Sequence, residues 1–159
     1  MRVGVIGGGL MGSGIAEVCA RSGVDVTLVE VDEARCEQTR AKIDKSLDRA
    51  ASTGRLEADD RVAAGERLAY TTRLEDLEGA DAAIEAVIEN EQAKRELFPK
   101  IDAILPNAEF LASNTSSVPI MKLAAGTSKP ERVLGMHFFN PVPVPVSYTH
   151  LTLPTTPYV

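Results

Sequence analysis

Met1-Arg-Val-Gly-Val-Ile-Gly-Gly-Gly-Leu-Met-Gly-Ser-Gly14 is the stretch that decides the fold of this 159-residue chain. An apolar strand that starts at Arg2 runs into a G-x-G-x-x-G loop, and an amphipathic helix follows. Gly7 permits the tight turn, Gly9 lets the backbone approach a pyrophosphate, and Gly12 allows close packing of helix on strand. The helix N-terminus adds free amide donors and a positive dipole end. The stretch predicts a dinucleotide site with these cofactor-binding candidates: Gly7, Gly9, Leu10, Met11 and Gly12. The alternative is a glycine-rich turn without a ligand.

The residues that follow complete one βαβ unit. The helix is predicted over 10–22, where Gly23 ends it, and its expected buried face comprises Leu10, Met11, Ile15, Val18 and Cys19. A buried strand is predicted over 24–31, and the crossover should be right-handed.

Glu30 is the predicted ribose ligand, because it ends the second strand 23 residues after Gly7. A carboxylate there repels a 2′-phosphate, which favours NAD over NADP. Asp32 competes for the same role. The alternative is that one or both acids simply start the next helix.

The remaining chain alternates helices and strands. A long charged helix over 32–53 and a second helix over 58–66 form a helical hairpin, inserted before a strand at 67–71. Further strands are predicted at 82–87, 109–112 and 133–139, with helices at 91–105 and 118–125 between them. The prediction is an α/β fold of Rossmann type, with a mostly parallel sheet and the hairpin inserted after strand two. Polar clusters at 89–90, 114–117 and 137–140 follow later strands, at the sheet edge where such folds bind ligands.

Composition excludes several classes of protein. A formal net charge of −6 provides no basic stripe for nucleic acid. No apolar run reaches the ~18 residues that span a membrane, and a signal peptide is not predicted. Cys19 and Cys36 fit neither a CxxC motif nor a disulfide framework. We therefore expect reduced thiols, no metal site and a cytoplasmic location.

Four motifs together resemble the amino-terminal, NAD-binding domain of the L-3-hydroxyacyl-CoA dehydrogenase family, which includes bacterial 3-hydroxybutyryl-CoA dehydrogenases. They are Val5-Ile-Gly-Gly-Gly-Leu-Met-Gly-Ser-Gly-Ile-Ala16, Ile84-Glu-Ala-Val-Ile-Glu-Asn90, Ala112-Ser-Asn-Thr-Ser-Ser117 and Gly135-Met-His-Phe-Phe-Asn-Pro-Val-Pro-Val144. The motifs occur in the family's order and span nearly all of residues 1–144. The last two are highly specific.

The resemblance implies a role for each matching residue. His137 matches the catalytic histidine, which takes the proton of the substrate 3-hydroxyl as hydride leaves C3 for nicotinamide. Ser116 matches the serine that hydrogen-bonds the reacting oxygen and contacts cofactor and substrate. Asn114 and Asn140 match residues around the nicotinamide and that oxygen, and Asn140 is counted with the catalytic group.

Other matches carry alternatives. Glu89 and Lys94 match cofactor-contacting residues, although Lys94 is also compatible with a surface helix charge. Ser46, in the inserted hairpin, falls where relatives touch CoA. Thr53 stands where some relatives have a basic residue, for which Arg49 or Arg55 could substitute.

The sequence departs from the family at two places. Glu30 stands where Asp is usual, and the longer side chain can still reach the ribose. After Val144 the family continues with Met-Lys-Leu-Val-Glu and a helical second domain, whereas residues 145–159 are rich in proline and threonine. Residues 146–155 look like the translation of a transposon-end sequencing adapter. We therefore expect a Rossmann domain over 1–144 and a non-native, irregular tail over 145–159; the alternative is a genuine Pro/Thr-rich terminus.

The resemblance implies NAD-dependent oxidation of L-3-hydroxyacyl-CoA in a parent enzyme, which relatives assemble as a homodimer through the second domain. A family glutamate that orients the histidine is replaced by Thr149, so we expect the chain as written to bind NAD weakly and to lack useful turnover. The alternatives are a β-hydroxyacid dehydrogenase for a free acid and a non-catalytic NAD-binding module.

Overall fold

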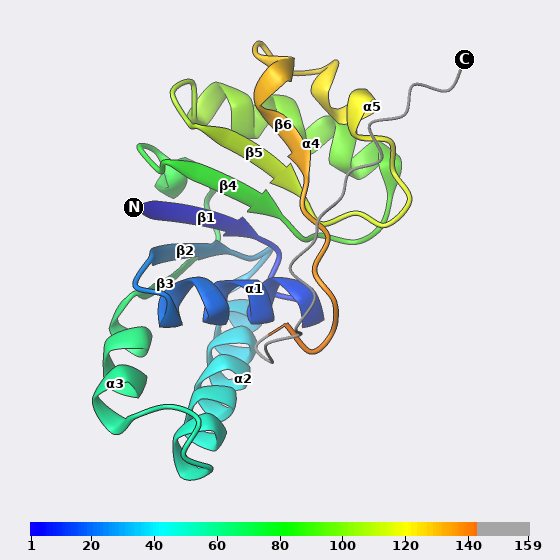
Figure 1. Cartoon of the computed structure of the whole chain (residues 1–159). Helices are drawn as coiled ribbons and strands as arrows, with labels where there is room; N and C mark the ends of the chain where they lie inside the picture. The colour runs from blue at the N-terminus through cyan, green and yellow to red at the C-terminus, as the bar shows by residue number, and fades with distance from the viewer. Residues whose placement is uncertain (143–159) are drawn as a thin grey trace.

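The computed structural model describes residues 1–142, and its centre is a six-stranded sheet in the order β3-β2-β1-β4-β5-β6 (Figure 1). All five strand pairings are parallel. The strands are β1 (Arg2–Ile6), β2 (Asp25–Val29), β3 (Leu68–Thr71), β4 (Ala82–Glu85), β5 (Phe110–Ser113) and β6 (Val133–Gly135). The order reverses between β1 and β4, so this is the predicted Rossmann-type arrangement, with its ligand crevice expected at that switch point.

Helices cover both faces of the sheet. They are α1 (Leu10–Arg21), α2 (Glu33–Ser52), α3 (Ala58–Glu66), α4 (Glu91–Ile104) and α5 (Ile120–Ala124), with short 3₁₀ turns η1 (Leu74–Leu77) and η2 (Pro130–Arg132). Figure 1 shows α1, α2 and α3 grouped beside β1–β3, and α4 and α5 beside β4–β6. The predicted helical hairpin after the second strand is confirmed as α2 and α3.

Alternation along the strands builds two separate cores. On β1, Val3 and Val5 face the core that Ile15 of α1 and Leu47 of α2 complete, whereas Ile6 faces the core on the α4 side. Because successive strand residues point to opposite faces, each buried strand needs apolar residues at nearly every position. This explains the nearly continuous apolar runs of the sequence.

Several details of the prediction are wrong. The strands predicted over 24–31 and 82–87 each end two residues earlier, at Val29 and Glu85. Leu10 was expected on the buried face of α1, but it is 60% exposed, since it lies at the open mouth of the glycine loop. The last strand was expected over 133–139, but β6 ends at Gly135. Beyond it the side chain of Asn114 accepts a hydrogen bond from the backbone N–H of Phe138 (2.9 Å), so a side chain replaces the next strand partner. His137 consequently lies in a loop.

Within residues 1–142, no helix is long and apolar enough to cross a membrane. In the same part of the chain, Cys19 and Cys36 are free. The expected tail at 145–159 and the substitution at Thr149 lie outside the described residues.

Candidate functional site

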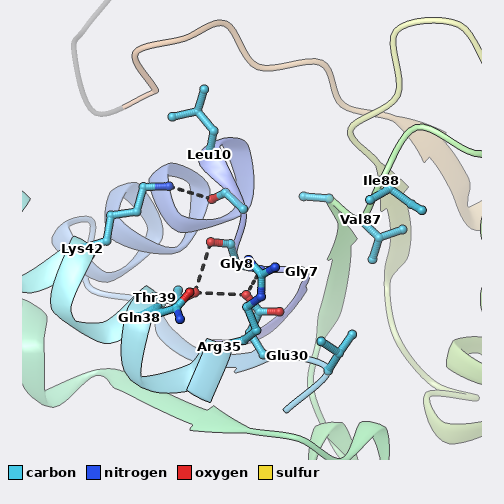
Figure 2. Close-up of a pocket in the computed structure, with 13 residues that line it drawn as sticks. Gly7, Gly8, Leu10, Glu30, Arg35, Gln38, Thr39, Lys42, Val87 and Ile88 are labelled. Atoms are coloured by element: carbon cyan, nitrogen blue, oxygen red, sulfur yellow. Dashed lines mark hydrogen bonds between the residues drawn. The ribbon is translucent and has the colours of Figure 1, made fainter. Parts of the chain in front are cut away.

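A cavity of about 510 Å³ opens at the carboxyl ends of β1, β2 and β4, next to the N-terminus of α1 (Figure 2). It lies where the strand order reverses, which is where open α/β sheets bind ligands. Its lining comprises Gly7, Gly8, Gly9, Leu10, Glu30, Val31, Arg35, Gln38, Thr39, Lys42, Ala86, Val87 and Ile88. Four of the predicted cofactor residues therefore line the same cavity: Gly7, Gly9, Leu10 and Glu30.

The glycine loop has the geometry that its three assigned tasks require. Gly7 has φ +93°, a conformation that L side chains rarely adopt. A Cβ on Gly12 would lie 1.7 Å from the carbonyl oxygen of Gly7, so only glycine permits this approach of α1 to the end of β1. A Cβ on Gly9 would meet nothing within 4 Å. Gly9 therefore faces open space at the helix N-terminus, where an anion such as a pyrophosphate fits.

Glu30 directly follows β2, and its carboxylate is turned toward the glycine loop. One oxygen accepts hydrogen bonds from the N–H of Gly8 (3.0 Å) and the hydroxyl of Thr39 (3.0 Å), as Figure 2 shows. Asp32 instead caps α2, because its side chain accepts from the N–H of Arg35 (2.7 Å). Of the two competing acids, Glu30 lines the cavity and Asp32 starts the helix.

One face of α2 supplies cavity residues that the sequence reading missed. Arg35, Thr39 and Lys42 follow one another at helical spacing and all line the cavity. The Lys42 ammonium donates to the carbonyl oxygen of Gly9 (3.2 Å), which places a positive charge beside the glycine loop. The spacing was readable in the sequence, but nothing there showed that this face points toward the loop.

Glu89 anchors the predicted serine loop. One carboxylate oxygen accepts from the N–H groups of Ser116 (2.9 Å) and Ser117 (3.1 Å), and from the hydroxyls of Thr115 and Ser117. Burial by itself would raise the pKa of Glu89, but hydrogen bonds from Thr115, Lys94, Ser116 and Ser117 outweigh it and lower the pKa from its ordinary 4.5 to about 2. The carboxylate stays ionised and holds this loop across a wide pH range.

Lys94 is not the surface helix charge that was considered. Its side chain is 0% exposed and its ammonium contacts Glu85 (2.7 and 2.9 Å) and Glu89 (3.1 Å). Glu85 is equally buried and was not singled out in the sequence. A direct contact of Lys94 with the cofactor stays a prediction.

The predicted catalytic residues lie on two loops beyond β5 and β6. Asn114 connects these loops through its hydrogen bond to the N–H of Phe138. His137 is exposed, and its ring lies 5.0 Å from that of Phe139, centroid to centroid. Within residues 1–142 no hydrogen bond joins His137 to Ser116 or Asn140.

Asn140 and Ser46 line a second, smaller cavity of about 140 Å³ beside α1 and α2. Lys42 and Leu10 line both cavities, so the predicted CoA contact at Ser46 is close to the glycine-loop cavity. Met11 and Gly12 do not line the larger cavity, and neither do Glu89, Lys94, Asn114, Ser116 and Asn140. Four of the predicted site residues therefore line the glycine-loop cavity, and Ser46 and Asn140 line the smaller cavity next to it. Glu89, Asn114 and Ser116 lie beyond the ends of β4 and β5.

A protein-family model and several known proteins match this chain over most of its length. The family model described as "3-hydroxyacyl-CoA dehydrogenase, NAD binding domain" matches residues 2–146. A 3-hydroxybutyryl-CoA dehydrogenase of Mycobacterium tuberculosis is 54% identical over 144 residues, which are 90% of this chain and 50% of that protein. The human mitochondrial hydroxyacyl-coenzyme A dehydrogenase is 38% identical over 89% of this chain and 47% of its own length.

Solved structures match equally well. The crystal structure of M. tuberculosis FadB2 superposes with a TM-score of 0.86 at 54% identity, over 90% of this chain and 50% of that one. The (S)-3-hydroxybutyryl-CoA dehydrogenase PaaH1 of Ralstonia eutropha gives a TM-score of 0.86 at 43% identity with the same coverage. The chain spans about half the length of the curated relatives it matches.

Proposed function

The chain belongs to the 3-hydroxyacyl-CoA dehydrogenase family through that family's NAD-binding domain, and on this premise we propose that it is the cofactor half of an enzyme that oxidises L-3-hydroxyacyl-CoA to 3-ketoacyl-CoA. The observation that carries the proposal is the joint presence of the glycine-loop cavity with Glu30 and of the Glu89-anchored serine loop, which Asn114 joins to the loop that carries His137.

The glycine-loop cavity fits the dinucleotide. Its open Gly9 and the N-terminus of α1 suit a pyrophosphate, and the Glu30 carboxylate suits a ribose diol. The same carboxylate repels a 2′-phosphate, so we expect NAD rather than NADP. When bound, NAD supplies hydride acceptance at its nicotinamide ring.

The loops beyond β5 and β6 supply the proton chemistry in this proposal. His137 Nε2 or Nδ1 accepts the proton of the substrate 3-hydroxyl, while the Ser116 hydroxyl donates a hydrogen bond to the same oxygen. Asn114 and Asn140 orient the groups around that oxygen. His137 is exposed and available for a substrate.

The acyl-CoA substrate is proposed from the relatives' names, since those of M. tuberculosis and R. eutropha are both 3-hydroxybutyryl-CoA dehydrogenases. Ser46, in the smaller cavity, is the proposed CoA contact. Arg49 or Arg55 is proposed to substitute for the basic residue that some relatives have at Thr53. The relatives carry about as much chain again as the part that matches, and we propose that such a second half completes the acyl site and forms a homodimer. A cytoplasmic location likewise stays a prediction.

A chimera tests the proposal. Residues 1–144 are joined to the carboxyl-terminal half of the M. tuberculosis relative, and NADH formation is followed with 3-hydroxybutyryl-CoA. We expect turnover by the chimera, a loss of about 10²- to 10⁴-fold in its His137→Gln variant, and none by the unfused chain. A folded chimera that binds NADH but does not oxidise the CoA ester would contradict the proposal.

Free 3-hydroxybutyrate, run in parallel, distinguishes the second enzyme class. Turnover of the free acid without turnover of the CoA ester would favour a β-hydroxyacid dehydrogenase. Binding of NADH without turnover of either substrate would favour a non-catalytic module.

A further inference from the structure

A buried ion pair lies beneath the serine loop. Glu85, at the end of β4, and Lys94, on α4, are both 0% exposed, and their charged atoms are 2.7 and 2.9 Å apart. The N–H of Val87 (2.8 Å) and the hydroxyl of Ser113 also donate to Glu85. Glu85 is therefore fully satisfied inside the protein.

A buried ion pair contributes little to the stability of a fold, because the cost of desolvating the two charges offsets their attraction. A protein with a well-packed apolar pair in the same place is often as stable. The geometry points to a second task. An ammonium has three N–H donors, and three carboxylate oxygens lie within reach of Lys94: both oxygens of Glu85 and one of Glu89 (3.1 Å). Two N–H donors of Lys94 therefore serve the buried pair with Glu85, and the third is available to Glu89, next to the serine loop.

Glu89 connects Lys94 to the serine loop. Its second oxygen accepts the N–H groups of Ser116 and Ser117, so the carboxylate joins Lys94 on one side to the loop on the other. Within residues 1–142 the one ion pair that Glu89 forms is with Lys94, and the same ammonium also pairs with Glu85. The donors on the loop are neutral.

We propose that Lys94 is a positioning residue: it fixes Glu89, and through Glu89 the loop that presents Ser116. The proposal rests on the proposed function in which Ser116 binds the reacting oxygen. The competing explanation is that Lys94 merely neutralises Glu85.

The double variant Glu85→Gln/Lys94→Met separates these explanations. Lys94→Met alone would leave Glu85 buried and unpaired, whereas the double variant removes both charges together and keeps a neutral interior. In this variant the loss of the Glu85 carboxylate by itself lowers the pKa of Glu89, whereas the loss of the Lys94 ammonium raises it. A raised pKa of Glu89 therefore reports the loss of Lys94. The Glu89 carboxyl is followed by ¹³C NMR titration, and the Ser116 and Ser117 amides by hydrogen exchange.

We expect the Glu89 pKa to rise by about one pH unit or more in the double variant, and the two amides to exchange about tenfold faster or more. Lys122→Met is the matched control, because Lys122 pairs with Glu91 (2.9 Å) and should leave both readouts unchanged. A folded double variant with the wild-type pKa and exchange rates would overturn the proposal.

A second measurement applies if the double variant does not fold. In the otherwise unchanged chain, Glu89→Gln should shift the Lys94 ¹⁵Nζ resonance, and an unshifted resonance would overturn the proposal. Titration of the unsubstituted chain with NADH distinguishes a failure of the proposed function from a failure of the positioning role of Lys94. Failure to bind NADH counts against the proposed function, whereas the Glu89 and Lys94 readouts test the positioning role by themselves.

Discussion

Gly9→Ala should separate cofactor binding from folding. A Cβ at Gly9 meets nothing within 4 Å, so the methyl group adds no clash in the protein. Alanine is a poorer N-cap than glycine and restricts the unfolded chain, and these small effects keep the unfolding free energy within about 1 kcal/mol of the original.

Binding should respond very differently. Gly9 lines the cavity at the N-terminus of α1, where a pyrophosphate would accept backbone N–H groups. A methyl group that keeps the phosphate away forfeits a hydrogen bond to a charged group, about 1.5–3 kcal/mol, which corresponds to about 10- to 100-fold in Kd. Isothermal titration with NADH measures the affinity, and thermal unfolding measures the stability.

Gly12→Ala is the matched control. Its Cβ would lie 1.7 Å from the carbonyl oxygen of Gly7, so this substitution should cost about 3 kcal/mol of stability or prevent folding. A folded Gly9→Ala protein that binds NADH with unchanged affinity would refute the reasoning that a phosphate lies over Gly9.

Three further predictions concern other charged groups. NADH should bind at least about tenfold more tightly than NADPH, since Glu30 repels a 2′-phosphate, and Glu30→Gln should narrow that ratio in parallel titrations. The lowered pKa of Glu89 adds stability that is complete above about pH 4.5 and is lost as pH falls toward about 2, so acid unfolding of Glu89→Gln should show a shallower pH dependence; identical slopes would contradict this. Arg132→Met removes the partner of buried Asp102 and should lower the unfolding free energy by about 3–5 kcal/mol in urea titrations; a loss below about 1 kcal/mol would count against a structural ion pair.

The sheet and the glycine loop were predictable from local pattern. Val3 and Val5 alternate with residues of the opposite core, and Gly7 and Gly12 occupy positions where only glycine fits. These features depend on residues that are close together in the sequence and on the geometry of one βαβ unit. They can therefore be predicted from one sequence.

The contacts between elements were less predictable. Lys94 lies four residues before Phe98 on the buried stripe of α4, so its burial was readable from helical spacing, but its partner Glu85 was not. The end of β6 at Gly135 depends on the Asn114 side chain taking over a strand's hydrogen bond, which no local pattern indicates. Such contacts form only when distant segments meet.

Titration of the 159-residue chain with NADH and NADPH tests the central claim most directly. The account predicts saturable binding of NADH at one site per chain, weaker binding of NADPH, and an NADH affinity that is about 10- to 100-fold lower in folded Gly9→Ala. An absence of NADH binding by the folded chain, or tighter binding of NADPH than of NADH, would contradict it.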